Sequence, residues 1–119
     1  MSIDSLEQLR VKLAQFAAER DWDQFHSPKN LSMALVAEAS ELIEHFQWLT
    51  EKQSHDIDQE KKLEVGLEMA DILIYLIRAA DKLDIDLIAM ANKKIKLNES
   101  RFPVASVKGK AGRGVDFNS

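Results

Sequence analysis

The sequence contains no cysteine and is poor in glycine, with four, and in proline, with two. Without cysteine the protein can form neither a disulfide nor a thiolate metal site and has no thiol nucleophile, which fits a reducing cytoplasm. The scarcity of glycine and proline, together with the lack of strand-like alternation, predicts an all-α fold. We therefore expect a cytoplasmic, all-α protein.

Positive charge and long apolar runs are also scarce. The 16 Lys and Arg residues are outnumbered by 20 Asp and Glu residues, and the net charge of −4 argues against a protein that binds duplex nucleic acid. The longest nearly apolar run, 69–80, is interrupted by Asp71 and Arg78 and is too short to span a bilayer. The first residues lack the basic and apolar regions of a signal peptide. We expect neither a nucleic-acid polymer nor a membrane as a partner.

Capping residues and apolar periodicity predict four helices within one domain. Their expected bounds are a capping box at Asp4 to about Arg20, Ser27 with Pro28 to about Thr50, about Asp58 to Leu83, and Asp86 to about Ser100, before Pro103. Residues 51–58 are expected to form a loop. Residues 1–103 then make the folded domain, and residues 104–119 a flexible basic tail.

Two acidic pairs at helical spacing are the most informative feature of the chain. Glu38 and Glu41 form one pair, and Glu68 and Asp71 form the other. Residues three apart lie on one face of a helix, so each pair can direct its carboxylates at one point. Both pairs lie within apolar stretches, 31–49 and 63–83, where ionised carboxylates need a compensating positive charge. All-oxygen ligands suit Mg²⁺ or Mn²⁺, which predicts a magnesium site in a helical bundle, serving a phosphate-bearing substrate.

Two other interpretations of the acidic pairs are weaker. A single pair is most often a solvated acidic face, but two pairs embedded among apolar residues argue against that explanation. A ferritin-like di-iron centre uses Glu-x-x-His from two helices. Here His45 follows Glu41 by four residues, and the predicted third helix contains no histidine, so iron is disfavoured.

The predicted third helix is apolar in nearly every direction except along one stripe. Glu64, Glu68, Asp71 and Tyr75 form this stripe. A helix of this kind is buried, either in its own bundle or in an oligomer interface. The stripe is therefore expected to face an interior site.

The predicted fourth helix carries polar residues on one face, Lys94, Asn98 and Arg101. Such donors can hold phosphate oxygens, with arginine acting through a bidentate fork. A basic face near a helix C-terminus is also favoured by the helix dipole alone. A neighbouring magnesium site favours the phosphate-binding interpretation.

Trp22 and Trp48 lie at predicted helix ends, where ligand pockets open, and could stack on a nucleobase. Phe16 and Phe25 are expected to be core residues. His26 lies beside a helix start, where a local hydrogen-bonding role is the alternative to ligand binding.

Taken together, these motifs resemble the MazG-like all-α nucleoside triphosphate pyrophosphohydrolases, and most of all their dCTP pyrophosphatase branch. The resemblance covers about Leu6 to Pro103. The matching segments are Phe16-Ala-Ala-Glu-Arg-Asp-Trp22, Glu41-Leu-Ile-Glu-His-Phe-Gln-Trp48, Asp71-Ile-Leu-Ile-Tyr75-Leu and Lys94-x-x-x-Asn98-x-x-Arg101-Phe-Pro.

The resemblance implies a four-helix bundle completed by oligomerisation, as a homodimer or homotetramer. It implies Mg²⁺-dependent conversion of a nucleoside triphosphate, dCTP or a modified dCTP, to the monophosphate and pyrophosphate in nucleotide-pool house-cleaning. The roles it implies are metal ligation and catalysis by Glu38, Glu41, Glu68 and Asp71; phosphate binding by Lys94, Asn98 and Arg101; a base pocket of Trp22, His26 and Trp48; and a sugar contact from Tyr75.

Other functions stay open at this point. The same fold could prefer another nucleotide, such as dUTP, dATP or phosphoribosyl-ATP, because the segment 50–60 is short and base selectivity depends on such loops. The chain could also be a non-enzymatic helical oligomerisation module, which would need no magnesium.

Overall fold

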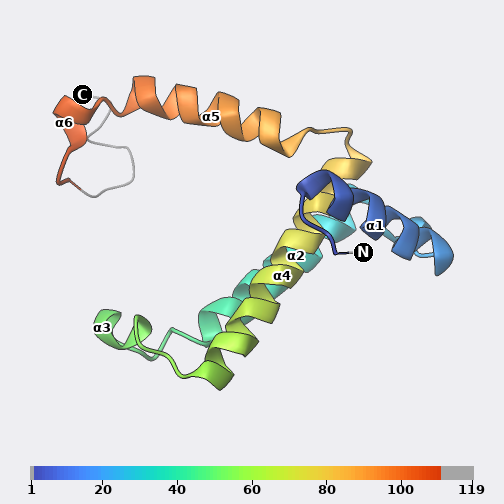
Figure 1. Cartoon of the computed structure of the whole chain (residues 1–119), viewed down its shortest axis with the longest axis horizontal. Coiled ribbons are helices and arrows are strands. Elements are labelled where there is room, and N and C mark those ends of the chain that lie inside the picture. The colour runs from blue at the N-terminus through green and yellow to red at the C-terminus, as the bar shows by residue number, and fades with distance from the viewer. Residues whose placement is uncertain (1, 111–119) are drawn as a thin grey trace. The chain divides into compact units, whose positions relative to one another are not determined.

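The computed structural model describes residues 2–110, and within them every regular element is helical. The predicted all-α fold is therefore confirmed. The elements are α1 (Leu6–Glu19), the 3₁₀ helix η1 (Asp23–Phe25), α2 (Pro28–Glu44), α3 (Glu51–Ser54), α4 (Gln59–Lys82), α5 (Leu87–Arg101) and α6 (Val104–Val107) (Figure 1). The chain divides into two compact units, with the boundary between Ile85 and Asp86.

Side-chain caps begin three of the long helices at the predicted residues. The Ser27 hydroxyl accepts a backbone N–H of α2 at 3.0 Å, and a proline follows in the first turn. The carboxylates of Asp58 and Asp86 do the same for α4 and α5, at 2.8 and 3.0 Å. Each cap satisfies a donor that the helix itself leaves unpaired.

The first helix begins one residue later than predicted. Ser5, not Asp4, is its N-cap, and the Ser5 hydroxyl accepts the backbone N–H of Gln8 at 3.1 Å. The Gln8 side chain accepts the backbone N–H of Asp4 at 2.8 Å. The predicted box was misplaced because Asp4 and Ser5 are both good capping residues and only geometry distinguishes them.

The second helix ends at Glu44 rather than near Thr50. The predicted loop that follows contains the short helix α3, which Thr50 caps. Thr50 and Gln53 form a reciprocal capping box, with distances of 2.9 and 3.1 Å. This pattern of threonine followed three residues later by glutamine was readable in the sequence as a helix start.

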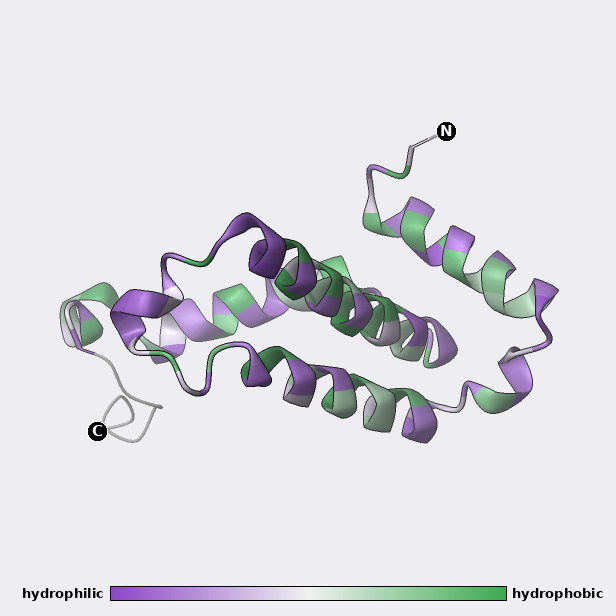
Figure 2. Cartoon of the chain, turned by 90° about the horizontal axis from the view of Figure 1, so that it is seen from below, coloured by the Kyte–Doolittle hydropathy of each residue, from purple (hydrophilic) through white to green (hydrophobic). Residues whose placement is uncertain are grey.

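The core of the first unit lies between α2 and α4, which run side by side, with α1 against α4 (Figure 1). Its buried apolar side chains are Ala17, Leu31, Val65, Ile77 and Ala80. In Figure 2 the long helices carry hydrophilic and hydrophobic residues side by side, as helices with one buried face do. None of the helices in residues 2–110 has the length and apolarity needed to cross a bilayer.

Left-handed aspartates end α1 and α4. Asp21 has φ of 55° and Asp84 has φ of 54°. The residue after each aspartate donates a hydrogen bond back into the helix. The Trp22 N–H donates to the Ala17 carbonyl at 2.9 Å, and the Ile85 N–H donates to the Ala80 carbonyl at 2.8 Å. This is the Schellman arrangement, usually made by glycine and tolerated here by a short polar side chain. The turn at Asp21 directs the chain into η1.

The second unit contains α5 and α6. The N–H of Phe102 donates to the carbonyl of Asn98 at 2.7 Å and ends α5 just before Pro103. The predicted tail begins with α6, and its residues 111–119 lie outside the described part of the chain.

Candidate metal centre

Three of the four predicted metal ligands lie together between α2 and α4. Glu38 and Glu41, three residues apart, project from one face of α2, and Glu68 projects from α4. One carboxylate oxygen from each residue lies within 4.8 Å of the others. Helices that run side by side thus bring together carboxylates that are far apart in sequence.

The three carboxylates repel one another. A hydrogen bond with Glu68, burial, and the hydrogen bond and negative charge of Glu41 raise the pKa of Glu38 to about 7. Glu68 is half-buried, and its Oε2 atom is shielded from solvent without a hydrogen-bond donor in the described part of the chain. A buried acceptor without a donor is unfavourable unless another positive group satisfies it.

A divalent cation fits this donor set. Carboxylate oxygens without sulfur or imidazole are the ligands that Mg²⁺ and Mn²⁺ prefer. The neighbouring lysine does not supply the missing charge, because the Lys61 ammonium lies 3.7 Å from Glu64 and 3.2 Å from the Nδ1 atom of His45. A metal ion between the carboxylates would satisfy the Glu68 oxygen and remove the repulsion.

The fourth predicted ligand, Asp71, lies apart from this cluster. It follows Glu68 by three residues on α4 and is exposed. The expectation that all four carboxylates converge on one point is therefore met by three of them in the single chain.

The predicted phosphate-binding residues lie in the second unit. Lys94, Asn98 and Arg101 are all on α5, at the spacing that puts them on one face. Lys94 and Arg101 are exposed and Asn98 is half-buried. The Arg101 guanidinium lies 5.2 Å from the ring centre of Phe102.

The predicted base pocket is not assembled within one chain. Trp22 precedes α2 and Trp48 follows it, and the 17 residues of this helix separate its two ends by about 25 Å. Trp22 packs edge-on against Phe16, with ring centres 5.7 Å apart, and lies 6.3 Å from His26. Trp48 is 87% exposed.

The expectation that Phe16 and Phe25 are core residues is wrong for the single chain, since they are 42% and 59% exposed. Phe16 instead covers Trp22 and stacks under the Arg20 guanidinium at 3.5 Å. Tyr75, the predicted sugar contact, is half-buried on α4, one turn beyond Asp71.

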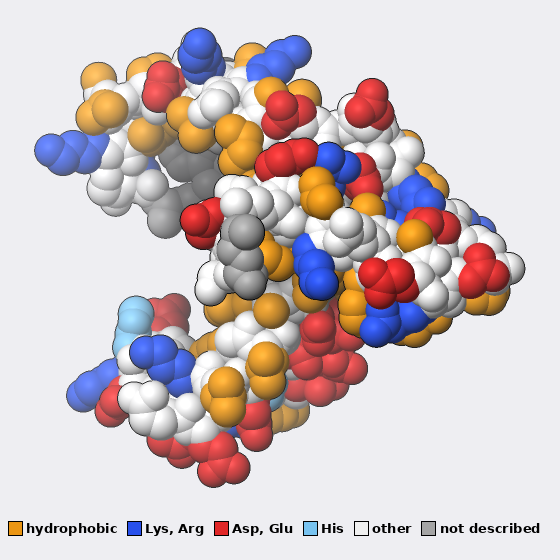
Figure 3. Space-filling model, turned by 45° about the vertical axis from the view of Figure 1, so that its right-hand side comes forward, with side chains coloured by type: hydrophobic (Ala, Val, Ile, Leu, Met, Phe, Trp, Pro, Cys, Tyr) orange, Lys and Arg blue, Asp and Glu red, His pale blue; other side chains and the backbone are white. Residues whose placement is uncertain are grey.

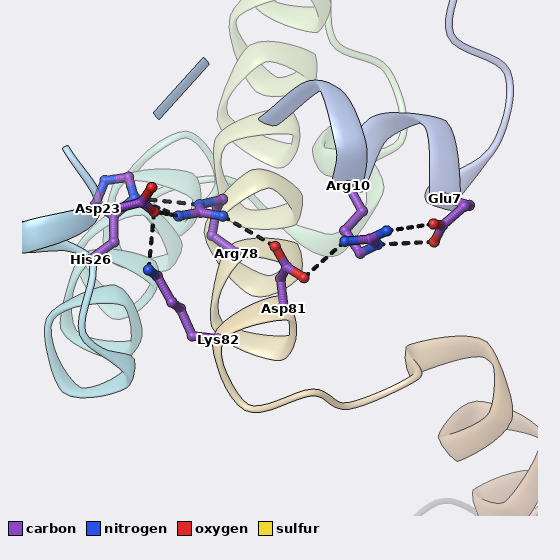
Figure 4. A network of polar contacts seen from close by, with 7 residues as sticks. All are labelled: Glu7, Arg10, Asp23, His26, Arg78, Asp81 and Lys82. Carbon is purple, nitrogen blue, oxygen red and sulfur yellow. Dashed lines mark hydrogen bonds and ion pairs between the residues drawn. The ribbon is translucent and has the colours of Figure 1, made fainter. Parts of the chain in front are cut away.

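A polar network near the C-terminal end of α4 was not predicted (Figure 4). Its centre is Arg78, which is only 4% exposed and pairs with Asp23 at 2.7 Å and Asp81 at 3.3 Å. Lys82 also contacts Asp23, at 3.0 Å, and Arg10 contacts Asp81, at 3.0 Å. The sequence feature that indicated this network is Arg78 itself, which lies within the longest apolar run. A buried arginine requires a partner of opposite charge.

The network also surrounds a predicted substrate-binding residue. The Arg78 guanidinium lies 3.3 and 3.4 Å from the Nδ1 atom of His26. Burial and the Arg78 charge lower the pKa of His26, and hydrogen bonds from Lys82 and Arg78 lower the pKa of Asp23 despite its desolvation.

Comparisons with known proteins place the chain among curated enzymes of one name. Rat and mouse dCTP pyrophosphatase 1 are each 40% identical to the chain over 115 residues, which is 95% of this chain and 68% of theirs. The human protein of the same name is 42% identical over 101 residues, 83% of this chain and 59% of its own. The chain belongs to the MazG-like dCTP pyrophosphatase family. No protein-family model matches the chain.

A solved structure extends the likeness to the fold. A pyrophosphatase from Archaeoglobus fulgidus matches with a TM-score of 0.79 and 34% identity, covering 87% of this chain and 96% of that one. Membership in the dCTP pyrophosphatase family confirms the resemblance inferred from the motifs and identifies the chain as an enzyme. Together with the acidic cluster it indicates a requirement for a divalent metal.

Proposed function

We propose that this enzyme hydrolyses dCTP, or a modified dCTP, to the nucleoside monophosphate and pyrophosphate with Mg²⁺ as its cofactor. The observation that carries the proposal is the convergence of Glu38, Glu41 and Glu68 on one point, with Asp71 one turn away. The name of the rat, mouse and human relatives, dCTP pyrophosphatase 1, supports the choice of base. In this proposal Glu38, Glu41, Glu68 and Asp71 hold the metal.

Each residue has a role in the proposed reaction. Bound Mg²⁺ would neutralise the triphosphate and the charge that develops on the leaving pyrophosphate. Glu41, the exposed member of the cluster, would orient a water molecule and accept one of its protons. The water oxygen then forms a bond to phosphorus as the bridging phosphorus–oxygen bond between the α- and β-phosphates breaks, and pyrophosphate leaves. Lys94, Asn98 and Arg101 hold phosphate oxygens. Tyr75 lies against the sugar and disfavours a 2′-hydroxyl.

We infer that the active enzyme is a homo-oligomer, a dimer or a tetramer. Apolar side chains on α4 are widely exposed in the single chain, among them Leu63 at 65%, Leu67 at 61% and Met69 at 52%. Hydrophobic side chains are visible over the surface in Figure 3. Soluble monomers rarely leave so much of one helix uncovered. A second copy could also supply a tryptophan to each base pocket, since one chain separates Trp22 from Trp48.

A nucleotide panel tests the proposal. The purified protein is incubated with Mg²⁺ and dCTP, CTP, dUTP, dATP or phosphoribosyl-ATP, and monophosphate and pyrophosphate are separated and quantified. We expect dCTP to be hydrolysed best and CTP clearly more slowly. Preferred hydrolysis of dUTP or dATP would mean that the enzyme has a different substrate. No hydrolysis of any nucleotide would contradict the proposed activity and favour a non-enzymatic helical oligomerisation module.

A further inference from the structure

Arg78 is a buried cation whose contacts extend beyond ion pairing. Asp23 and Asp81 balance its charge, at 2.7 and 3.3 Å. Each of these carboxylates has a second partner, since Lys82 contacts Asp23 and Arg10 contacts Asp81. The contacts of Arg78 with His26 are therefore not needed to balance charge, and their effect is on the imidazole ring of His26.

The contact determines where the histidine proton lies. Arginine has only donors, so the Nδ1 atom that faces its Nε–H and Nη2–H groups at 3.4 and 3.3 Å must accept. A neutral imidazole that accepts at Nδ1 carries its proton on Nε2. Within residues 2–110, Nε2 takes part in no hydrogen bond, although the ring is half-buried beside Trp22.

We propose that Arg78 is a positioning residue that holds His26 as the Nε2–H tautomer, so that the segment 22–26 presents one aromatic face and one hydrogen-bond donor to a pyrimidine base. The inference rests on the proposed function and deepens it. Stacking on Trp22 cannot choose between bases, because every base has a π-face. A fixed donor directed at N3 would distinguish the two pyrimidines, because N3 of cytosine is an acceptor whereas N3 of uracil carries a proton and is a donor.

The position of Arg78 separates this role from the chemistry. Arg78 follows Glu68 by ten positions on α4, which is about 15 Å along the helix. Arg78 therefore does not touch the metal or the reacting phosphates, and its loss should weaken nucleotide binding rather than the chemical step.

Nitrogen NMR of the full-length protein reads the tautomer directly. In wild type we expect the His26 spectrum of the Nε2–H form, with an unprotonated Nδ1. In Arg78→Met the chain keeps the length and burial of the side chain, and Asp23 and Asp81 keep Lys82 and Arg10, so the fold should survive. We expect the tautomer preference to be lost in this variant.

Two further variants make the comparison specific. Lys82→Met removes the other cation at Asp23 without contacting His26, so the Nε2–H form should persist. Arg78→Lys retains a positive donor, and partial recovery of the Nε2–H form is expected. If Arg78→Met does not fold, the comparison of Arg78→Lys with Lys82→Met still decides the inference. Only Arg78→Lys should change the nitrogen signals of His26.

Steady-state kinetics with dCTP tests the link to the base. In Arg78→Met we expect KM to rise about three- to tenfold, because one hydrogen bond to the base is lost, while kcat stays within about twofold of wild type. Lys82→Met should leave both constants unchanged. An unchanged His26 tautomer in folded Arg78→Met, or a lost tautomer with an unchanged KM, would overturn the inference. If wild type does not hydrolyse dCTP, the proposed function and the base contact fail together, while the tautomer measurement still decides what Arg78 does to His26.

Discussion

Arg78 and Asp23 form an ion pair of 2.7 Å although 55 residues separate them in the sequence. The pair joins the segment between α1 and α2 to the C-terminal part of α4. Because Arg78 is 4% exposed, removing the aspartate would leave a buried charge with fewer partners, which is costly. The segment that carries Trp22 is therefore held on α4 by charge as well as by packing.

The carboxylate cluster predicts which substitutions abolish activity. We expect Glu38→Gln, Glu68→Gln and Asp71→Asn each to abolish dCTP hydrolysis and to leave the helical circular dichroism intact. Glu64→Gln is a matched control on α4 and should retain activity, because within residues 2–110 the Glu64 carboxylate pairs with Lys61 at 3.7 Å and lies outside the three-carboxylate cluster. Near wild-type turnover in any of the first three variants would refute the four-ligand assignment.

Removing the metal should lower stability. We expect Mg²⁺ to raise the melting temperature, because a ligand at 100 times its Kd stabilises the native state by about 2.7 kcal/mol. Without metal, Glu68→Gln should melt above wild type, since one repelling charge is gone. Differential scanning calorimetry with Mg²⁺ and with EDTA measures both effects. A wild-type melting temperature that does not respond to Mg²⁺ would argue against the site.

The exposed face of α4 predicts a change in oligomeric state. Light scattering should return a mass of two or four 13.5 kDa subunits at micromolar concentration. Leu67→Asp should lower this mass, because it would bury a charge in the interface. Lys12→Asp is the control, because it also adds negative charge but at an exposed position on α1, and it should leave the mass unchanged. A wild-type mass near one subunit would mean that α4 is not an interface.

The aromatic residues predict changes in substrate selectivity. Trp22→Ala or Trp48→Ala should raise KM for dCTP tenfold to a hundredfold, since stacking on a base contributes about 1–3 kcal/mol. Tyr75→Ala should instead narrow the gap between dCTP and CTP, because it opens space beside the 2′-carbon. Steady-state kinetics with both nucleotides distinguishes the two effects. Equal rates for dCTP, CTP and ATP in wild type would rule out this pocket.

The Arg78 network predicts that stability falls with acidification. The pKa of His26 is lowered in the folded protein by burial and by Arg78, despite Asp23, so between pH 6.5 and this lower value the unfolded state binds more protons. The contribution of His26 to stability is therefore complete above pH 6.5 and decreases as the pH falls. The lowered pKa of Asp23 adds a further loss below pH 3.8, its ordinary value. Urea unfolding from pH 8 to pH 4, compared between wild type and His26→Gln, measures the contribution of His26, which the variant should lack.

The family could be recognised from the resemblance of the residue motifs to those of known dCTP pyrophosphatases. Within these motifs, the acidic pairs on α2 and α4 and the polar positions on α5 follow the period of a helix. The N-caps Ser27 and Asp86 and the start of α4 near Asp58 were also correctly predicted, because capping depends on residues three apart. Local rules of this kind need no knowledge of which helices touch.

The tertiary structure decided how these local features combine. The pairing of α2 with α4 brings Glu68 to Glu38 and Glu41 while Asp71 stays outside the cluster, a distinction that helical spacing cannot make. The length of α2 separates the two tryptophans that the sequence suggested as one pocket. In the sequence, Arg78 only interrupts an apolar run. In the structure its partners Asp23 and Asp81 lie on η1 and α4, and Arg78 is the centre of a polar network. Spacing along the sequence determines the face of a helix on which a residue lies, but which faces meet depends on packing between helices far apart in the chain.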